Sequence, residues 1–178
     1  LNDSKVLNIE KNLANLNLNN IFTKNKNEIS QVIYSYNTIE NYNIIKNYPS
    51  TLNIEINLTN FLAKINDGGK TSIIGSNGRL IDSKYFNANL PYIFGKPEIK
   101  EFLEFKKIID QSKFSYKQIN NFYFYPSKRW DLELKNDIII KLPNSNILKS
   151  INQSYDFLND TNGRDIKIID TRIKNQII

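Results

Sequence analysis

The sequence contains no cysteine and no histidine. Without cysteine the chain has neither a disulfide framework nor a thiolate metal site, and the redox state of its compartment stays open. Without histidine it lacks the commonest general base, the commonest zinc ligand and the usual partner of a serine or cysteine nucleophile. Most hydrolase mechanisms are thereby excluded, and we expect no catalytic residue, no metal ligand and no cofactor.

A long apolar run is also missing, because no stretch approaches the roughly 20 apolar residues that cross a bilayer. The numbering begins at Leu1 rather than at Met, so we expect the sequence to be part of a longer chain. Hydrophobic residues make up 40% of the 178 residues, which is enough to build a core. This length allows one large domain or two small ones.

Positive charge is in excess, with a formal net charge of +6. Such a balance suits nucleic acid or anionic lipid, but the Lys and Arg residues are scattered singly among Asn and Ser. Phosphate binding needs clustered cations, so the sequence favours a solvated surface over a nucleic-acid patch.

The first 60 residues are typical of a small α+β unit. Apolar spacing predicts helices over 4–16 and 26–34. After residues 42–44, the run YPST at 48–51 indicates a turn, and apolar and polar residues then alternate over 52–58. Two strands alone are marginal in water, so a third is expected upstream of Leu1 or from the next domain.

Short strands and turns follow from residue 61 onward. Strands are predicted over 62–65, 70–74 and 79–82, joined by Asp-Gly and Asn-Gly turns that tolerate positive φ. Pro97 then introduces a helix over 98–111 that should cover the sheet.

The clearest strand is the alternating run RWDLELK at 129–135, whose return strand is 138–142. A three-residue loop would set Leu132 opposite Ile140 and Trp130, as a core residue, opposite Leu142. In this register Asp131 pairs with Lys141 on the solvent-facing side.

A helix over 146–158 and two strand-like runs, 165–170 and 172–178, complete the chain. The fold class is therefore α+β: a small unit over residues 1–60, then a mixed, largely antiparallel β domain with covering helices over 61–178.

Four strings resemble motifs of the FtsQ/DivIB family of bacterial cell-division proteins. Residues 49–56, PSTLNIEI, resemble the P-x-T-L-x-I-x-I hairpin of the family's POTRA domain, and 90–95, LPYIFG, resemble its l-P-x-i-x-G. Residues 129–143 are similar to the R-W-x-L-x-L…I-x-x-x-L-P hairpin common in the alphaproteobacterial branch, and 169–172 to the C-terminal I-D-x-R. The chain departs from the family at Asp137, where the hairpin usually has Gly, and the family's first POTRA strand has no counterpart.

The resemblance implies a non-enzymatic scaffold of the divisome, with residues 1–60 as a POTRA-like domain. It implies a transmembrane helix upstream of this sequence, a periplasmic location at the inner membrane of the division septum, and partners of the FtsB/DivIC and FtsL types. No nucleic acid and no small-molecule substrate are expected.

Docking is predicted on residues 171–178, as an exposed edge strand that pairs with a partner by β-augmentation. The edge is comparatively apolar, and a frayed terminus is the alternative interpretation. The predicted partner-binding residues are Thr171, Arg172, Ile173, Asn175 and Ile177, with Lys128 and Arg129 on the neighbouring hairpin.

Other motifs have alternative interpretations. Asp131 and Glu133 share a strand face, which suits a glycosidase pair or merely outward charges. Tyr123 and Tyr125, followed by Lys128 and Arg129, suit either a basic single-stranded nucleic-acid-binding module or a half-buried strand. The run GGKT at 68–71 lacks the first glycine and the helix of a phosphate loop, so it indicates a hairpin turn.

Overall fold

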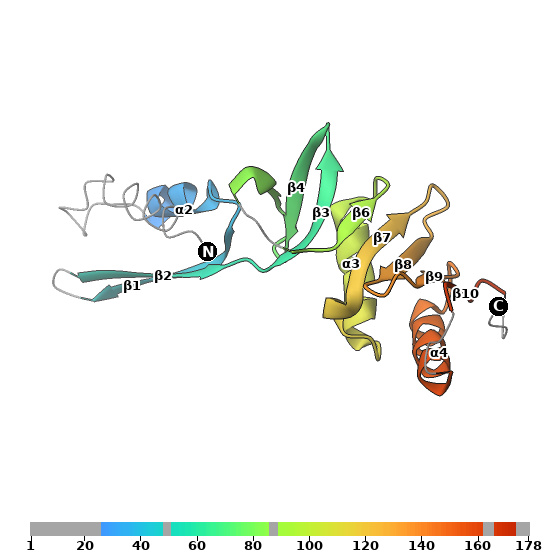
Figure 1. Ribbon diagram of the computed structural model, residues 1–178. Coiled ribbons are helices and arrows are strands. Elements are labelled where there is room, and N and C mark those ends of the chain that lie inside the picture. The colour runs from blue at the N-terminus through green and yellow to red at the C-terminus, as the bar shows by residue number, and fades with distance from the viewer. Residues whose placement is uncertain (1–25, 48–50, 86–88, 162–165, 174–178) are drawn as a thin grey trace.

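The computed structural model describes residues 26–47, 51–85, 89–161 and 166–173 (Figure 1). In chain order the elements are α2 Lys26–Tyr34, β1 Ile39–Asn47, β2 Thr51–Leu58, β3 Phe61–Asp67, β4 Lys70–Gly75, β5 Leu80–Asp82, the 3₁₀ turn η1 Ser83–Tyr85, β6 Tyr92–Phe94, α3 Ile99–Gln111, the 3₁₀ turn η2 Tyr116–Gln118, β7 Ile119–Phe124, β8 Trp130–Leu134, β9 Ile139–Lys141, α4 Ile147–Asp160 and β10 Ile168–Asp170.

The strands form two separate sheets. Strands β1 and β2 make a two-stranded antiparallel sheet, which extends away from the rest of the molecule in Figure 1. The remaining strands form an eight-stranded sheet in the order β10-β9-β8-β7-β6-β3-β4-β5. Only Thr59 and Asn60 lie between the last strand of the first sheet and the first strand of the second.

The first unit has its own small core. Helix α2 has the predicted bounds, and its buried Ile29 and Ile33 pack with Ile39 of β1. Along β2, half-buried and exposed residues alternate as predicted. The helix predicted over 4–16 and the turn at 48–50 lie outside the described residues.

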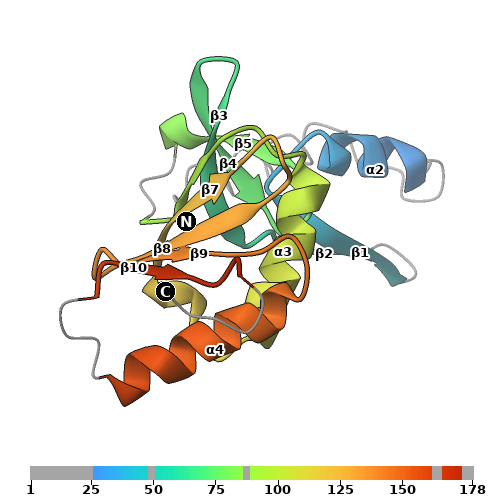
Figure 2. The same cartoon turned by 90° about the vertical axis from the view of Figure 1, so that its right-hand side faces the viewer.

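Both long helices of the second unit lie on one face of the large sheet (Figure 2). Helix α3 connects the parallel neighbours β6 and β7, and α4 connects the parallel neighbours β9 and β10. Parallel strands cannot be joined by a tight hairpin, so each crossover needs such a connection. The strands predicted over 62–65, 70–74 and 79–82 are present as β3, β4 and β5.

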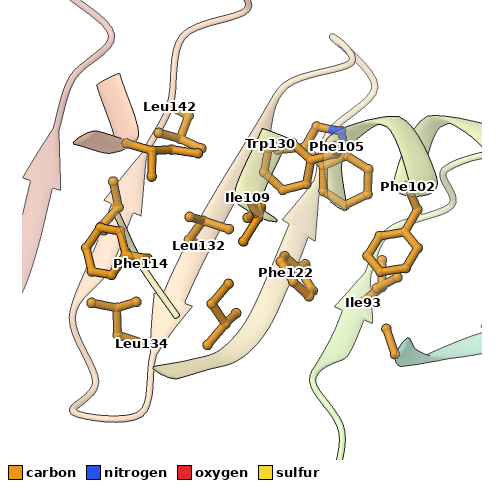
Figure 3. Packing of buried hydrophobic residues seen from close by; sticks show 14 of the residues in the cluster. Ile93, Phe102, Phe105, Ile109, Phe114, Phe122, Trp130, Leu132, Leu134 and Leu142 are labelled. Carbon is orange, nitrogen blue, oxygen red and sulfur yellow. The ribbon is translucent and has the colours of Figure 1, made fainter. Parts of the chain in front are cut away.

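Trp130 lies in the core between the sheet and α3, as predicted (Figure 3). It is 5% exposed. Its ring stacks on Phe105 with centroids 4.7 Å apart and planes 6° apart, and it also contacts the rings of Phe102 and Phe124. These contacts join α3 to β7 and β8.

The predicted register of the β8–β9 hairpin is confirmed. Leu132 lies opposite Ile140 and Asp131 opposite Lys141, and Asp137 adopts the left-handed conformation with φ 63°. The predicted exposure of Asp131 is wrong, because this residue is only 1% exposed. Burial is tolerated because its carboxylate accepts hydrogen bonds from neighbouring groups, as described below.

A strand was expected over 172–178, but the two described residues of this run do not form one. Arg172 and Ile173 have no regular secondary structure, and residues 174–178 lie outside the described residues. The backbone N–H of Arg172 donates to the carboxylate of Asp170 (3.1 Å), a local bond that competes with strand pairing. Of the run predicted as a strand over 165–170, residues Ile168–Asp170 form a strand, which is β10.

Candidate functional site

Strand β10 forms one edge of the large sheet. The N–H of Ile139 donates to the carbonyl of Lys167 (2.9 Å), and the N–H of Thr171 donates to the carbonyl of Lys141 (3.0 Å). Because alternate residues of a strand turn toward a given neighbour, the backbone groups of Ile168 and Asp170 point away from β9. In the part of the chain that the structure describes, no strand pairs with that side.

Thr171 anchors the end of this edge. Its hydroxyl donates to the carbonyl of Lys141 (2.9 Å), which also accepts from the Thr171 backbone. The residue is 6% exposed. Thr171 therefore holds β10 against β9, and its side chain presents little surface to a partner.

Asp170 and Arg172 form a forked ion pair just beyond the edge. The Arg172 Nε donates to both carboxylate oxygens of Asp170, at 2.8 and 3.0 Å, and Nη2 donates to Oδ2. The hydrogen bonds from Arg172 lower the pKa of Asp170, and the carboxylate in turn raises the pKa of Arg172. A fork of this kind holds the guanidinium in a defined orientation.

A second charge pair lies close by, on the β7–β8 side. The buried Asp131 carboxylate accepts from the backbone N–H of Leu142 (3.1 Å), and from Nε and Nη2 of Arg129 at 3.3 and 3.4 Å. The Arg129 guanidinium lies 4.3 Å from the centre of the Tyr125 ring. Asp131 also acts electrostatically on Arg172 and raises its pKa, so the structure brings Arg129 and Arg172 into one region.

Lys128 points elsewhere. It adopts a left-handed conformation in the turn before β8, and its ammonium donates to Glu101 on α3 (2.9 Å). This contact raises the pKa of Lys128 and, as the largest cause, lowers that of Glu101. Of the predicted partner-binding residues, Lys128 is thus directed at the helix rather than at the edge.

Two exposed apolar side chains lie at the edge, one on β10 and one just after it. Ile168 is 49% exposed and Ile173 is 51% exposed. Ile173 was among the predicted binding residues, whereas Ile168 was missed. The sequence shows two consecutive isoleucines, Ile168 and Ile169, of which a one-sided strand buries only one, but it does not indicate which of them is exposed. Asn175 and Ile177, also predicted, lie outside the described residues.

The carboxylates considered as a catalytic pair are held by separate structural bonds. Glu133 accepts from the Tyr123 hydroxyl (2.6 Å) and from Asn121 (2.8 Å). Burial raises the pKa of Glu133, but these hydrogen bonds outweigh burial and lower it overall. Burial and the bond to Glu133 raise the pKa of Tyr123 to about 12.

The residues considered for nucleic acid do not form a free cationic platform. Lys128 is paired with Glu101, Arg129 is paired with Asp131, and Tyr123 is bonded to Glu133. Phosphate contacts would have to displace carboxylates that already neutralise these cations.

The run GGKT forms the β3–β4 hairpin turn, with Gly68 and Gly69 at φ 57° and 87°. Within the described ranges, no cluster of three or more metal-ligating side chains occurs. Within the same ranges, no helix has both the length and the apolar character needed to cross a membrane.

Comparison with known proteins gives one family match. The family model described as "Cell division protein FtsQ/DivIB, C-terminal" matches residues 63–172, which is more than half of the chain. Among solved structures, the chain is similar to the major extracytoplasmic domain of the trans isomer of the cell-division protein DivIB from Geobacillus stearothermophilus. The identity is 13% and the TM-score 0.40, over 61% of this chain and 98% of that one. No curated protein matches the sequence.

Proposed function

Because the chain belongs to the FtsQ/DivIB family of cell-division proteins, we propose that it is a non-enzymatic scaffold that docks other divisome proteins along the β10 edge. The partners are proteins of the FtsB/DivIC and FtsL types, bound on the periplasmic side of the inner membrane at the septum. In this proposal the α2–β1–β2 unit is part of a POTRA-like domain, and residues 61–178 form the domain that receives the partner.

The outward backbone of β10, with which no described strand pairs, is the observation that carries this proposal. A partner strand that adds to β10 would bond to the outward groups of Ile168 and Asp170, and backbone hydrogen bonds supply affinity in this mode of recognition. Edge strands are commonly blunted by Lys or Pro, whereas β10 begins with the exposed, apolar Ile168.

Side chains around the edge supply specificity. Ile168 and Ile173 offer apolar contacts on either side of the Asp170–Arg172 fork. Arg129 and Arg172 are each paired with a carboxylate, Asp131 and Asp170, so they offer a partner oriented polar groups rather than net charge. Thr171 contributes by holding the edge in place, and we retain Asn175 and Ile177 as proposed contacts.

The test is a comparison of two substitutions at one position of β10. Ile168→Pro removes an N–H that faces away from β9 and leaves the bonds between the two strands intact, because proline is tolerated on an edge of this kind. The binding partner is the FtsB-like protein encoded in the same genome, and affinity is measured by calorimetry. We expect Ile168→Pro to weaken binding at least about tenfold, the equivalent of about 1.4 kcal/mol.

Ile168→Ala is the matched control. It removes the exposed side chain but keeps the N–H, so it should weaken binding less than Ile168→Pro. Ile173→Pro tests whether docking continues beyond the strand. Undiminished binding by Ile168→Pro, with an unchanged far-UV spectrum, removes the docking site from β10.

A further inference from the structure

An open pocket of about 500 Å³ lies at the end of the β8–β9 hairpin, where the hairpin turn, η2 and the C-terminal half of α4 meet. Strand β8 runs from Trp130 to Leu134, and the pocket lies at its Leu134 end. Arg129 and Asp131 lie at the other end of this strand. The pocket is therefore separate from the docking edge described above. Its lining residues are Phe114, Lys117, Gln118, Leu134, Lys135, Asn136, Tyr155, Leu158 and Asn159.

The floor of the pocket is apolar and packed against the main core. Phe114 and Leu134, both labelled in Figure 3, are 6% and 4% exposed and belong to the main core. The Phe114 ring meets the Tyr155 ring of α4 edge to face, with centroids 5.0 Å apart. Leu158 is half-buried against the same core. An inserted apolar side chain would thus meet a surface that is already packed.

The rim of the pocket is positively charged. Lys117 and Lys135 are exposed, and neither forms an ion pair with another described residue. The other rim groups are the neutral amides of Gln118, Asn136 and Asn159, and no carboxylate is among the lining residues.

The two lysines are held on a defined backbone. The N–H of Lys135 donates to the carbonyl of Gln118 (2.8 Å), which ties the hairpin turn to η2. In turn, the Gln118 side chain accepts from the backbone N–H of Ser115 (2.8 Å) and fixes η2. The positions from which both ammonium groups project are therefore set before any ligand arrives, which reduces the entropy lost on binding.

We infer that this pocket is a second docking site, which takes an acidic peptide segment carrying one large apolar side chain. The apolar side chain lies on the floor formed by Phe114, Leu134, Tyr155 and Leu158, and carboxylates of the segment pair with Lys117 and Lys135. Charge complementarity selects this occupant, because two lysines that pair with no described carboxylate border an apolar floor, and no carboxylate is among the lining residues. The volume accommodates such a side chain with its neighbouring backbone.

The probe is a fluorescent peptide of twelve residues, made of Asp, Glu and Ser with one central Leu. Binding to the whole chain is measured by fluorescence anisotropy, and the contact surface is mapped from amide shifts in ¹⁵N–¹H spectra. We expect saturable binding that weakens with salt, with the largest shifts at Lys117, Lys135, Asn136 and Asn159. Replacing the central Leu by Ala should weaken binding.

Two charge-reversed variants separate a site from general attraction to a basic protein. Lys117→Glu with Lys135→Glu should weaken binding roughly tenfold or more, because two ion pairs become repulsive contacts. Lys70→Glu with Lys84→Glu makes the same change in net charge at a distance and should leave binding nearly unchanged. Equal losses in both variants, shifts confined to β10, or no saturable binding would each overturn the inference. Self-association abolished only by the first variant would assign the pocket to a second copy of the chain and also overturn it.

Discussion

Trp130 shows how one side chain joins the sheet to its covering helix. Its indole stacks on Phe105 of α3, while its backbone belongs to β8. Removal of such a side chain forfeits its transfer free energy and leaves a cavity whose rigid walls close only in part. Trp130 therefore contributes to stability rather than to a contact surface.

We expect Trp130→Ala to lower the free energy of unfolding by about 3–5 kcal/mol, measured by urea denaturation. Phe94→Ala is the control, because Phe94 is 45% exposed on the face of the sheet away from the helices. Its loss should cost about 1 kcal/mol or less, since only its ring contacts disappear. An unchanged midpoint for Trp130→Ala together with lost partner binding would instead make Trp130 a surface contact.

In the β8–β9 hairpin, backbone hydrogen bonds hold the turn in place although one of its residues has an unfavourable conformation. Asp137 has φ 63°, a conformation that a side chain with a Cβ adopts only with strain. The turn is closed by bonds from the N–H of Leu134 to Ile138 and from the N–H of Asp137 to Leu134. The element therefore keeps its register despite the unfavourable residue.

Asp137→Gly should raise the free energy of unfolding by about 0.5–1 kcal/mol, because glycine adopts this φ without strain. The neighbouring Asn136→Gly is the matched control. Asn136 does not have positive φ. Glycine at this position relieves no strain and only increases the conformational entropy of the unfolded chain, so it should lower stability. Thermal unfolding of both variants distinguishes these effects, and equal shifts would contradict the assignment to φ.

At the scale of the whole molecule, the two units have separate apolar cores and a polar joint. The cluster around Ile29 and Ile33 shares no residue with the main core. The Asn77 side chain bridges the units, since Nδ2 donates to the carbonyls of Asn37 and Ile39, both at 2.9 Å. Asn37 donates back to the carbonyl of Leu80 (2.8 Å).

Further polar contacts complete this joint. Ser76 donates to Glu40 (2.7 Å), and the guanidinium of Arg79 donates to the carbonyl of Tyr34 at the end of α2 (3.2 Å). Such bonds are directional, so they define an orientation that a purely apolar contact would leave less specified. We therefore expect the first unit to keep a constant orientation relative to the large sheet.

Asn77→Ala should loosen this joint, because it removes the donor of two hydrogen bonds between the units, each worth about 0.5–1.5 kcal/mol. ¹⁵N relaxation measures the effect, and the expected result is a shorter tumbling time for residues 39–58 than for residues 61–161. Asn66→Ala is the control, since the Asn66 side chain accepts from the N–H of Gly69 within the β3–β4 turn, away from the joint. Identical tumbling times in the Asn77 variant would show that the joint does not depend on this side chain.

Local periodicity was sufficient for several elements. The bounds of α2, the turn at Gly68 and Gly69, and the Leu132–Ile140 register follow from patterns within short stretches. Alternation and turn chemistry act between residues close in sequence, so they can be read without knowledge of the fold.

Tertiary contacts decided the rest. The burial of Asp131 depends on Arg129 and on the N–H of Leu142, which satisfy its carboxylate only when β8 and β9 are assembled. Strand β6 lies between β3 and β7, and β10 lies at the edge of the sheet. Both positions depend on long crossover connections, which bring together residues far apart in the chain. The sequence by itself determined which segments alternate and which residues meet within a hairpin. Only the tertiary structure determined which strands end the large sheet and which lysines meet a described carboxylate, because both depend on groups far apart in the chain.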